Sequence, residues 1–185
     1  MPTRTIHPII CGVLLILGTA PRLSAQAGSA DSMKAAFRLR AETAAALASG
    51  QSKPEEALDR LRKANAPMGL HLEADGEFAF AAIDVGRRLL GAGKPVEAEI
   101  FFRAAEASLD LVIARAPAGA KRNKAQYLGQ RGVIRANYLN KLAEGRADLE
   151  AALQVLPDDE YLRQLLNLLP ADPAATLQHH QKAPR

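Results

Sequence analysis

Hydrophobic residues recur every three or four positions along most of this chain, in segments separated by Gly- and Pro-rich breaks. This spacing is typical of amphipathic helices. Strands would need Val, Ile, Thr and Tyr alternating with polar residues, and such runs are missing. The sequence therefore predicts an all-α protein with seven helices, covering Asp31–Ser49, Pro54–Asn65, Asp75–Leu90, Pro95–Ala114, Lys121–Leu142, Arg146–Leu156 and a last segment that follows Asp158 or Asp159.

Helix boundaries are predicted from local chemistry. Pro54 and Pro95 suit the first turn of a helix, where the missing N–H costs nothing. Asp75 and the Asp158–Asp159 pair stand where a carboxylate can cap free N–H groups. In the last helix, Leu162, Leu165 and Leu169 share one side and are expected to face inward.

The first 27 residues have the features of a signal peptide. Arg4 precedes an apolar run from Ile9 to Leu17, and Ala25-Gln26-Ala27 matches the small-x-small pattern of a cleavage site. The run is shorter than the roughly 20 residues that span a bilayer. We expect cleavage after Ala27 and an exported protein, periplasmic or secreted, without a membrane span; the alternative is an uncleaved anchor.

Cleavage would remove the only cysteine, Cys11, so no disulfide would stabilise the mature protein. It would also remove Arg4 and Arg22, which reduces the 24 basic residues of the full chain to 22, against 20 acidic ones. Such a small positive charge does not favour nucleic acid as a partner.

A small, large, small pattern occurs three times in the predicted helices, as Ala57-Leu61-Ala64, Ala98-Phe102-Ala105 and Gly145-Leu149-Ala152. Small residues at these offsets let two helix backbones approach, and the large residue fills the space beside them. Gly86, in the preceding helix, is expected to allow the same close approach within a hairpin.

These residues resemble tetratricopeptide repeats, in which Ala-x3-Phe-x2-Ala occupies the second helix of a helix–turn–helix unit. The spacing between the three copies exceeds the roughly 34 residues of the standard repeat, so longer helices or loops are expected. The resemblance implies a right-handed stack of antiparallel helical hairpins over residues 28–170, closed by a C-terminal capping helix and followed by a flexible tail, 171–185. An irregular helical bundle is the alternative.

Candidate catalytic chemistry is sparse. His71 stands alone and His179-His180 lies in the tail, so neither has the spacing of a zinc site. Phosphate-binding loops and nucleophile motifs are missing, and Glu97, Glu99 and Glu106 are interpreted as solvated helix surface. We expect no enzymatic activity, no metal and no cofactor.

A candidate binding surface lies on the fifth predicted helix. The side chains that share one side of it are Lys124, Tyr127, Arg131, Arg135 and Tyr138, and Arg87 or Arg88 of the third helix could extend this side. Arg and Tyr suit a protein or peptide partner with carboxylates. The alternative is an ordinary solvated surface. If the surface binds such a partner, replacing Arg131 and Arg135 together with Ala should abolish capture of the partner and leave the melting curve nearly unchanged.

The sequence therefore favours an exported helical-repeat module that binds a peptide or protein partner. Acidic segments are among the candidate partners. Two other functions stay open. The chain could be a structural subunit of an envelope assembly, or a small helical hydrolase whose site is formed by residues far apart in the sequence.

Overall fold

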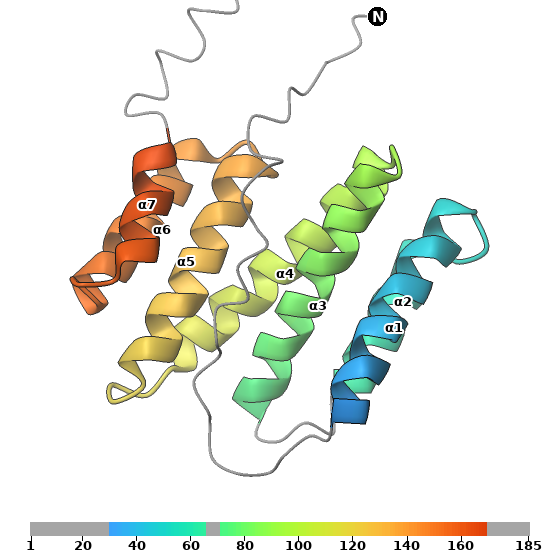
Figure 1. Cartoon of the computed structure of the whole chain (residues 1–185), viewed down its shortest axis with the longest axis horizontal. Coiled ribbons are helices and arrows are strands. Elements are labelled where there is room, and N and C mark those ends of the chain that lie inside the picture. The colour runs from blue at the N-terminus through green and yellow to red at the C-terminus, as the bar shows by residue number, and fades with distance from the viewer. Residues whose placement is uncertain (1–29, 66–70, 170–185) are drawn as a thin grey trace, which may run out of the picture.

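The computed structural model describes residues 30–65 and 71–169, and Figure 1 shows these residues as a row of helices. Seven α-helices and no strand occur in these two ranges, which confirms the all-α prediction. The helices are α1 (Ala30–Ala48), α2 (Pro54–Asn65), α3 (His71–Gly91), α4 (Pro95–Arg115), α5 (Lys121–Asn137), α6 (Leu142–Val155) and α7 (Glu160–Leu168). The predicted signal peptide and C-terminal tail lie outside the described residues.

Helices that are consecutive in the chain pack against each other. The closest pairs are α3 with α4 and α5 with α6, while α1 and α2 both contact α3. Helix α4 also contacts α5, and α7 contacts α6. In Figure 1 the α1–α2 pair lies at one end of the row and the α6–α7 pair at the other. None of the helices in the described ranges is long and apolar enough to cross a membrane.

The turns before α2, α4 and α6 share a local design. In each, the backbone carbonyl of a lysine accepts the first helical hydrogen bond, and the N–H donor belongs to Ala57, Ala98 or Gly145. The lysines before α4 and α6 have nearly the same backbone angles, with φ of −112° and −115°. The residue ahead of each, Gly93 or Asn140, has positive φ. The three small residues that start the sequence pattern thus occupy equivalent places after their turns.

Three expected helix boundaries are wrong. Helix α3 begins at His71 rather than near Asp75, so Asp75 does not cap it. Instead, the backbone carbonyl of Asp75 accepts a hydrogen bond from Ser108 in α4 (3.0 Å). Helix α5 ends at Asn137 and α6 begins at Leu142, because the chain turns at Asn140 with a φ of 55°. That turn contains no Gly or Pro that would have indicated it in the sequence.

The contact between α3 and α4 confirms the role expected for Gly86. A Cβ atom on Gly86 would lie 2.8 Å from the Phe102 ring, closer than real Cβ contacts allow. Ala98, Phe102 and Ala105 are all fully buried. The missing side chain of Gly86 therefore makes room for the ring, and this explains the residue types in the Ala98 pattern.

The other two copies of the pattern pack less uniformly. Gly145, Leu149 and Ala152 are buried, and a Cβ on Gly145 would lie 2.6 Å from the backbone oxygen of Gly132 in α5. In α2, Ala57 and Leu61 are buried but Ala64 is exposed. Helices α5 and α6 thus cross with the backbones of Gly132 and Gly145 in contact. The copy of the pattern in α2 buries only two of its three positions.

Helix α7 follows its prediction closely. The Asp159 carboxylate accepts a hydrogen bond from the N–H of Leu162 (3.0 Å), so Asp159 is the cap. Leu162 and Leu169 are buried and Leu165 is half-buried. These leucines join an apolar cluster with residues of α5 and α6, while a larger cluster joins α1, α2, α3 and α4 with Tyr127 and Ile134 of α5.

Candidate interaction surface

The predicted binding residues Arg131 and Arg135 bind carboxylates of their own chain. Arg131 donates two hydrogen bonds to Asp148 of α6 (2.6 and 2.9 Å) and one to Asp110 of α4 (2.6 Å). Arg135 donates to Glu106 of α4 (2.7 Å) and to Asp148 (3.0 Å). The ammonium of Lys141 binds both oxygens of Glu106, at 2.8 and 2.9 Å. Three cations and three carboxylates thus form one network that joins α4, α5 and α6.

Two carboxylates of this network are buried, because Glu106 is 8% exposed and Asp148 is 6% exposed. Burial acts to raise the pKa of Glu106, but hydrogen bonds from Lys141 and Arg135 outweigh it, so this pKa is lowered. Burial likewise acts to lower the pKa of Arg131, and hydrogen bonding to Asp148 reverses the effect. The interpretation of Glu106 as solvated surface is therefore wrong.

The two predicted tyrosines also pack inside the protein. Tyr127 is 8% exposed, its ring lies 6.1 Å from that of Phe80, and its hydroxyl lies against Gly76 of α3. Tyr138 is half-buried and stacks on Phe102, with 4.2 Å between the ring centroids. Lys124 is half-buried and forms no ion pair with a described residue.

For these four residues, both the predicted binding surface on α5 and its alternative, a solvated surface, are therefore corrected. Its two arginines and two tyrosines face α3, α4 and α6, because these helices pack on that side of α5. Replacing Arg131 and Arg135 with Ala would leave three carboxylates without their guanidinium partners, and so the melting curve should change. Sequence periodicity placed these residues together correctly but could not show which neighbouring helix covers them.

The two candidates in α3 differ from each other. Arg88 is exposed and pairs with Asp84 one turn earlier (3.0 Å). Arg87 is half-buried, and within the described ranges it has no carboxylate partner and no acceptor for its buried Nε. A buried guanidinium N–H without an acceptor is costly. Arg87 is therefore the one of these two arginines whose charge has no carboxylate partner among the described residues.

Tyr161 of α7 lies on the same side of the molecule as Arg87. Its phenol is 47% exposed, and burial raises its pKa, while the positive charge of Arg87 acts in the opposite direction. In Figure 1, α3 and α7 lie on opposite sides of α5, so this electrostatic effect acts across α5. Sequence analysis missed Tyr161 because nothing local to α7 indicates its proximity to α3.

The part of α5 between Arg87 and Tyr161 carries amides. Tyr127 contacts α3 and Gly129 contacts Leu162 of α7, so these residues mark the two covered sides of α5. At 100° per residue, Gln126 and Gln130 lie between those sides. We call the surface formed by Phe80, Arg87, Gln126, Gln130 and Tyr161 the α3–α5–α7 face; in Figure 1 these three helices lie nearer the viewer than α4 and α6.

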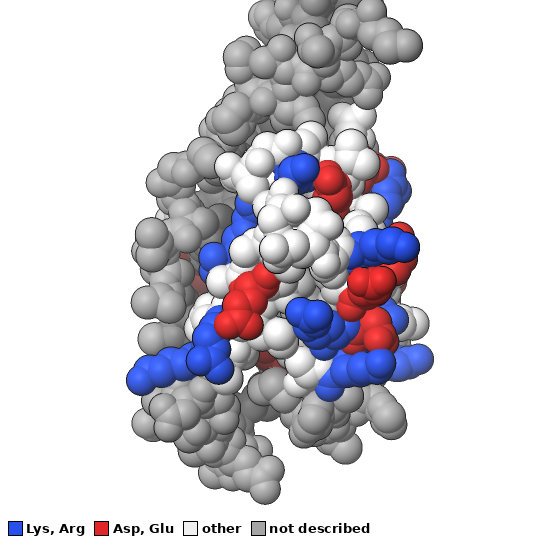
Figure 2. Space-filling model, turned by 90° about the vertical axis from the view of Figure 1, so that its right-hand side faces the viewer, with Lys and Arg blue, Asp and Glu red and all other residues white. Residues whose placement is uncertain are grey.

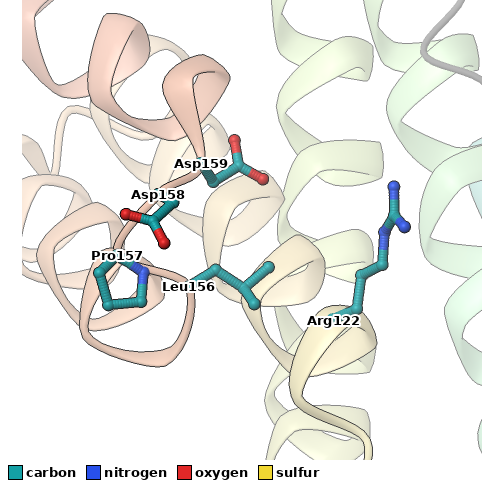
Figure 3. Close-up of a pocket in the computed structure, with 5 residues that line it drawn as sticks. All are labelled: Arg122, Leu156, Pro157, Asp158 and Asp159. Atoms are coloured by element: carbon teal, nitrogen blue, oxygen red, sulfur yellow. The ribbon is translucent and has the colours of Figure 1, made fainter.

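A shallow hollow lies where the start of α5 meets the α6–α7 turn (Figure 3). It is lined by Arg122, Leu156, Pro157, Asp158 and Asp159. The Asp159 carboxylate caps α7, and the guanidinium of Arg122 points away from both aspartates. The lining has no serine, cysteine or histidine. In the parts of the chain that the structure describes, no group of three or more His, Cys, Asp or Glu could hold a metal ion.

Surface charge at the α1–α2 end is mixed in sign. Figure 2 shows this end with basic and acidic side chains interspersed around an uncharged area. Several of these charges pair within one helix, as Lys63 does with Asp59 (2.6 Å) and Arg38 with Glu42 (3.6 Å). This end therefore lacks the single-sign field that attracts nucleic acid.

Comparisons with protein-family models, with curated proteins and with solved structures find no match to this chain. Arguments about its function therefore rest on the geometry described above.

Proposed function

We propose that this chain is an exported tetratricopeptide-like module, spanning residues 28–170, that binds an acidic peptide or protein segment on the α3–α5–α7 face. It has no catalytic role in this proposal. Three features of the helices support the repeat architecture: the similar turns before α2, α4 and α6, the small residue that follows each turn, and the fit of Phe102 against Gly86. In such an architecture α1, α3 and α5 would be the first helices of three hairpins, and α7 would be the cap.

Arg87 is the observation that carries the proposed binding activity. Four neighbouring arginines of α3, α4 and α5, namely Arg88, Arg103, Arg131 and Arg135, have carboxylate partners within the chain. Arg87 has none among the described residues, although its Nε is buried. A carboxylate from a partner would bind the terminal guanidinium nitrogens of Arg87 with charge-assisted hydrogen bonds, and Phe80 and Tyr161 would supply aromatic contact area beside it.

The matched pair of variants Arg87→Gln and Arg88→Gln tests this proposal. The protein is immobilised and used to select peptides from a phage-displayed library of short random sequences. We expect enrichment of peptides that contain Asp or Glu, and loss of their binding in Arg87→Gln but not in Arg88→Gln. Both variants change a neighbouring arginine to the same residue, so a general effect of charge would reduce binding equally. Equal binding by both variants, or no enrichment of any peptide, would contradict the proposed function.

A further inference from the structure

Helix α1 stands at one end of the row, and its outer side is left open by the other described helices (Figure 1). Helices α2 and α3 pack against α1, in which Thr43, Ala44 and Leu47 are buried. At the opposite end of the row, α7 packs on α6 and buries Leu162. Among the described residues, the row therefore has a covering helix at the α6 end and none at the α1 end.

The outer side of α1 carries a line of exposed side chains, Ala35, Arg38, Glu42 and Ala45. At 100° per residue these four positions fall within about 80° of the helix circumference, and the line is about 15 Å long. Lys34 is also exposed and borders it. The small side chains at both ends of the line allow another helix to approach α1 closely, because the distance between packed helices depends on the side chains at the contact.

The chemistry of this line is symmetric about its centre. Ala35 precedes Arg38 by three residues, and Ala45 follows Glu42 by three. A second α1 that runs antiparallel, centred at the level of Arg40, places each Arg38 opposite the Glu42 of the other copy, and each Ala35 opposite an Ala45. A parallel helix in register would place Arg38 opposite Arg38. The line is therefore complementary in charge to its own copy in an antiparallel arrangement with two-fold symmetry.

The two charges of the line are available to a second copy. The Arg38 and Glu42 side chains are 76% and 63% exposed, and their closest nitrogen and oxygen atoms are 3.6 Å apart, which is too long for a hydrogen bond. The exposed pair on α2, Lys63 with Asp59, is closer at 2.6 Å and has the charged Glu56 three residues before it, so it lacks this symmetry. Figure 2 shows charges of both signs around an uncharged area at this end, a distribution that can face its own copy without net repulsion.

We propose that two copies of this chain form a dimer through antiparallel α1 helices, in which Arg38 of each copy pairs with Glu42 of the other. The two-fold arrangement uses the same line of residues on both copies, so it closes as a dimer and does not continue into a filament. The proposal goes beyond peptide binding on the α3–α5–α7 face and does not depend on it.

Sedimentation equilibrium over a wide range of protein concentrations tests the proposal. The exported protein is compared with the charge reversals Arg38→Glu and Glu42→Arg, alone and mixed in equal amounts, and with the double variant Arg38→Glu/Glu42→Arg. The matched control is Glu99→Arg, which reverses one charge of an exposed pair with Arg103 on α4. Because the altered side chains are exposed, circular dichroism should show each variant folded and melting close to the unmodified protein.

We expect a monomer–dimer equilibrium for the unmodified protein and for Glu99→Arg. Each single reversal should weaken the dimer about tenfold or more, because it places like charges opposite each other at two points of the antiparallel pair. The mixture of the two single variants should recover the dimer, since every opposing pair is then of opposite sign. The double variant should dimerise like the unmodified protein for the same reason.

Three results would overturn this inference. They are an unmodified protein that stays monomeric at every concentration, single reversals that dimerise as well as Glu99→Arg, and a mixture of the two single variants that dimerises no better than either alone. Binding of a different protein to this side of α1 in place of a second copy would also count against it. Peptide selection with Arg87→Gln and Arg88→Gln is measured separately, so the failure of either proposal is distinguishable from the failure of the other.

Discussion

Asp148→Asn is the substitution that most directly tests whether the ionic network stabilises the fold. Asp148 is 6% exposed and accepts hydrogen bonds from Arg131 at 2.6 and 2.9 Å and from Arg135 at 3.0 Å. Asparagine keeps the size of the side chain but removes its charge and one acceptor oxygen. The two guanidinium groups would then share only Asp110 and Glu106.

The expected loss of folding free energy in Asp148→Asn follows from these contacts. Removing one partner of a buried ion pair costs about 3–5 kcal/mol. Here both arginines keep another carboxylate and are partly accessible to water, which reduces the loss to about 2–3 kcal/mol. Because small domains have about 5–15 kcal/mol of total stability, this loss is large enough to measure.

Urea denaturation, followed by circular dichroism, measures this change as a lower midpoint with an unchanged slope. Asp59→Asn is the matched control, since Asp59 pairs with Lys63 at 2.6 Å on the exposed surface of α2. That variant should lose less than about 0.5 kcal/mol. If the two variants differ by less than about 1 kcal/mol, the network does not stabilise the fold as reasoned from its burial.

Three further predictions concern pH, packing and export. Because the pKa of Glu106 is lowered in the folded state, its contribution to stability is complete above the ordinary value of 4.5 and is lost as pH falls through the folded-state pKa. Glu106→Gln should therefore flatten the acid side of a plot of stability against pH. An unchanged plot would contradict this role of Glu106. Phe102→Ala should cost about 3–5 kcal/mol in urea melts, whereas exposed Glu99→Ala should cost less than about 0.5 kcal/mol; similar losses would argue against close packing on Gly86. N-terminal sequencing of the exported protein should begin at Gly28, and a chain beginning at Met1 in the membrane fraction would support an uncleaved anchor.

Local chemistry was sufficient to predict several elements of this fold. The boundaries of α2 match the prediction, and α4 differs by one residue, because proline favours the first turn of a helix and both starts carry one. Asp159 caps α7 through a hydrogen bond that spans only three residues. The repeated small, large, small pattern also identified buried positions, since its offsets follow from the period of a single helix.

Other features depend on residues that are distant in the sequence. Arg131 and Arg135 bind carboxylates 13 to 29 residues away, and Lys141 binds Glu106 across 35 residues. The sequence indicated that one side of α5 is basic, but a basic side can face solvent or a buried carboxylate with the same periodicity. Only the packing of α4 and α6 decided between these two positions.

In the candidate site, too, some features could be predicted from the sequence and others depend on tertiary packing. Sequence periodicity selected Arg87 and Arg88 together, because they are neighbours at the end of one helix. The tertiary structure separates them, since Arg88 reaches Asp84 one turn away while Arg87 has no carboxylate partner in the described ranges. Periodicity and capping act within a few residues and can be read from the sequence, whereas the partner of a charged side chain is determined by how helices pack. For this protein, the sequence by itself determined the helices and their small contact residues, and the packing of α4, α5 and α6 decided which charged groups bind one another.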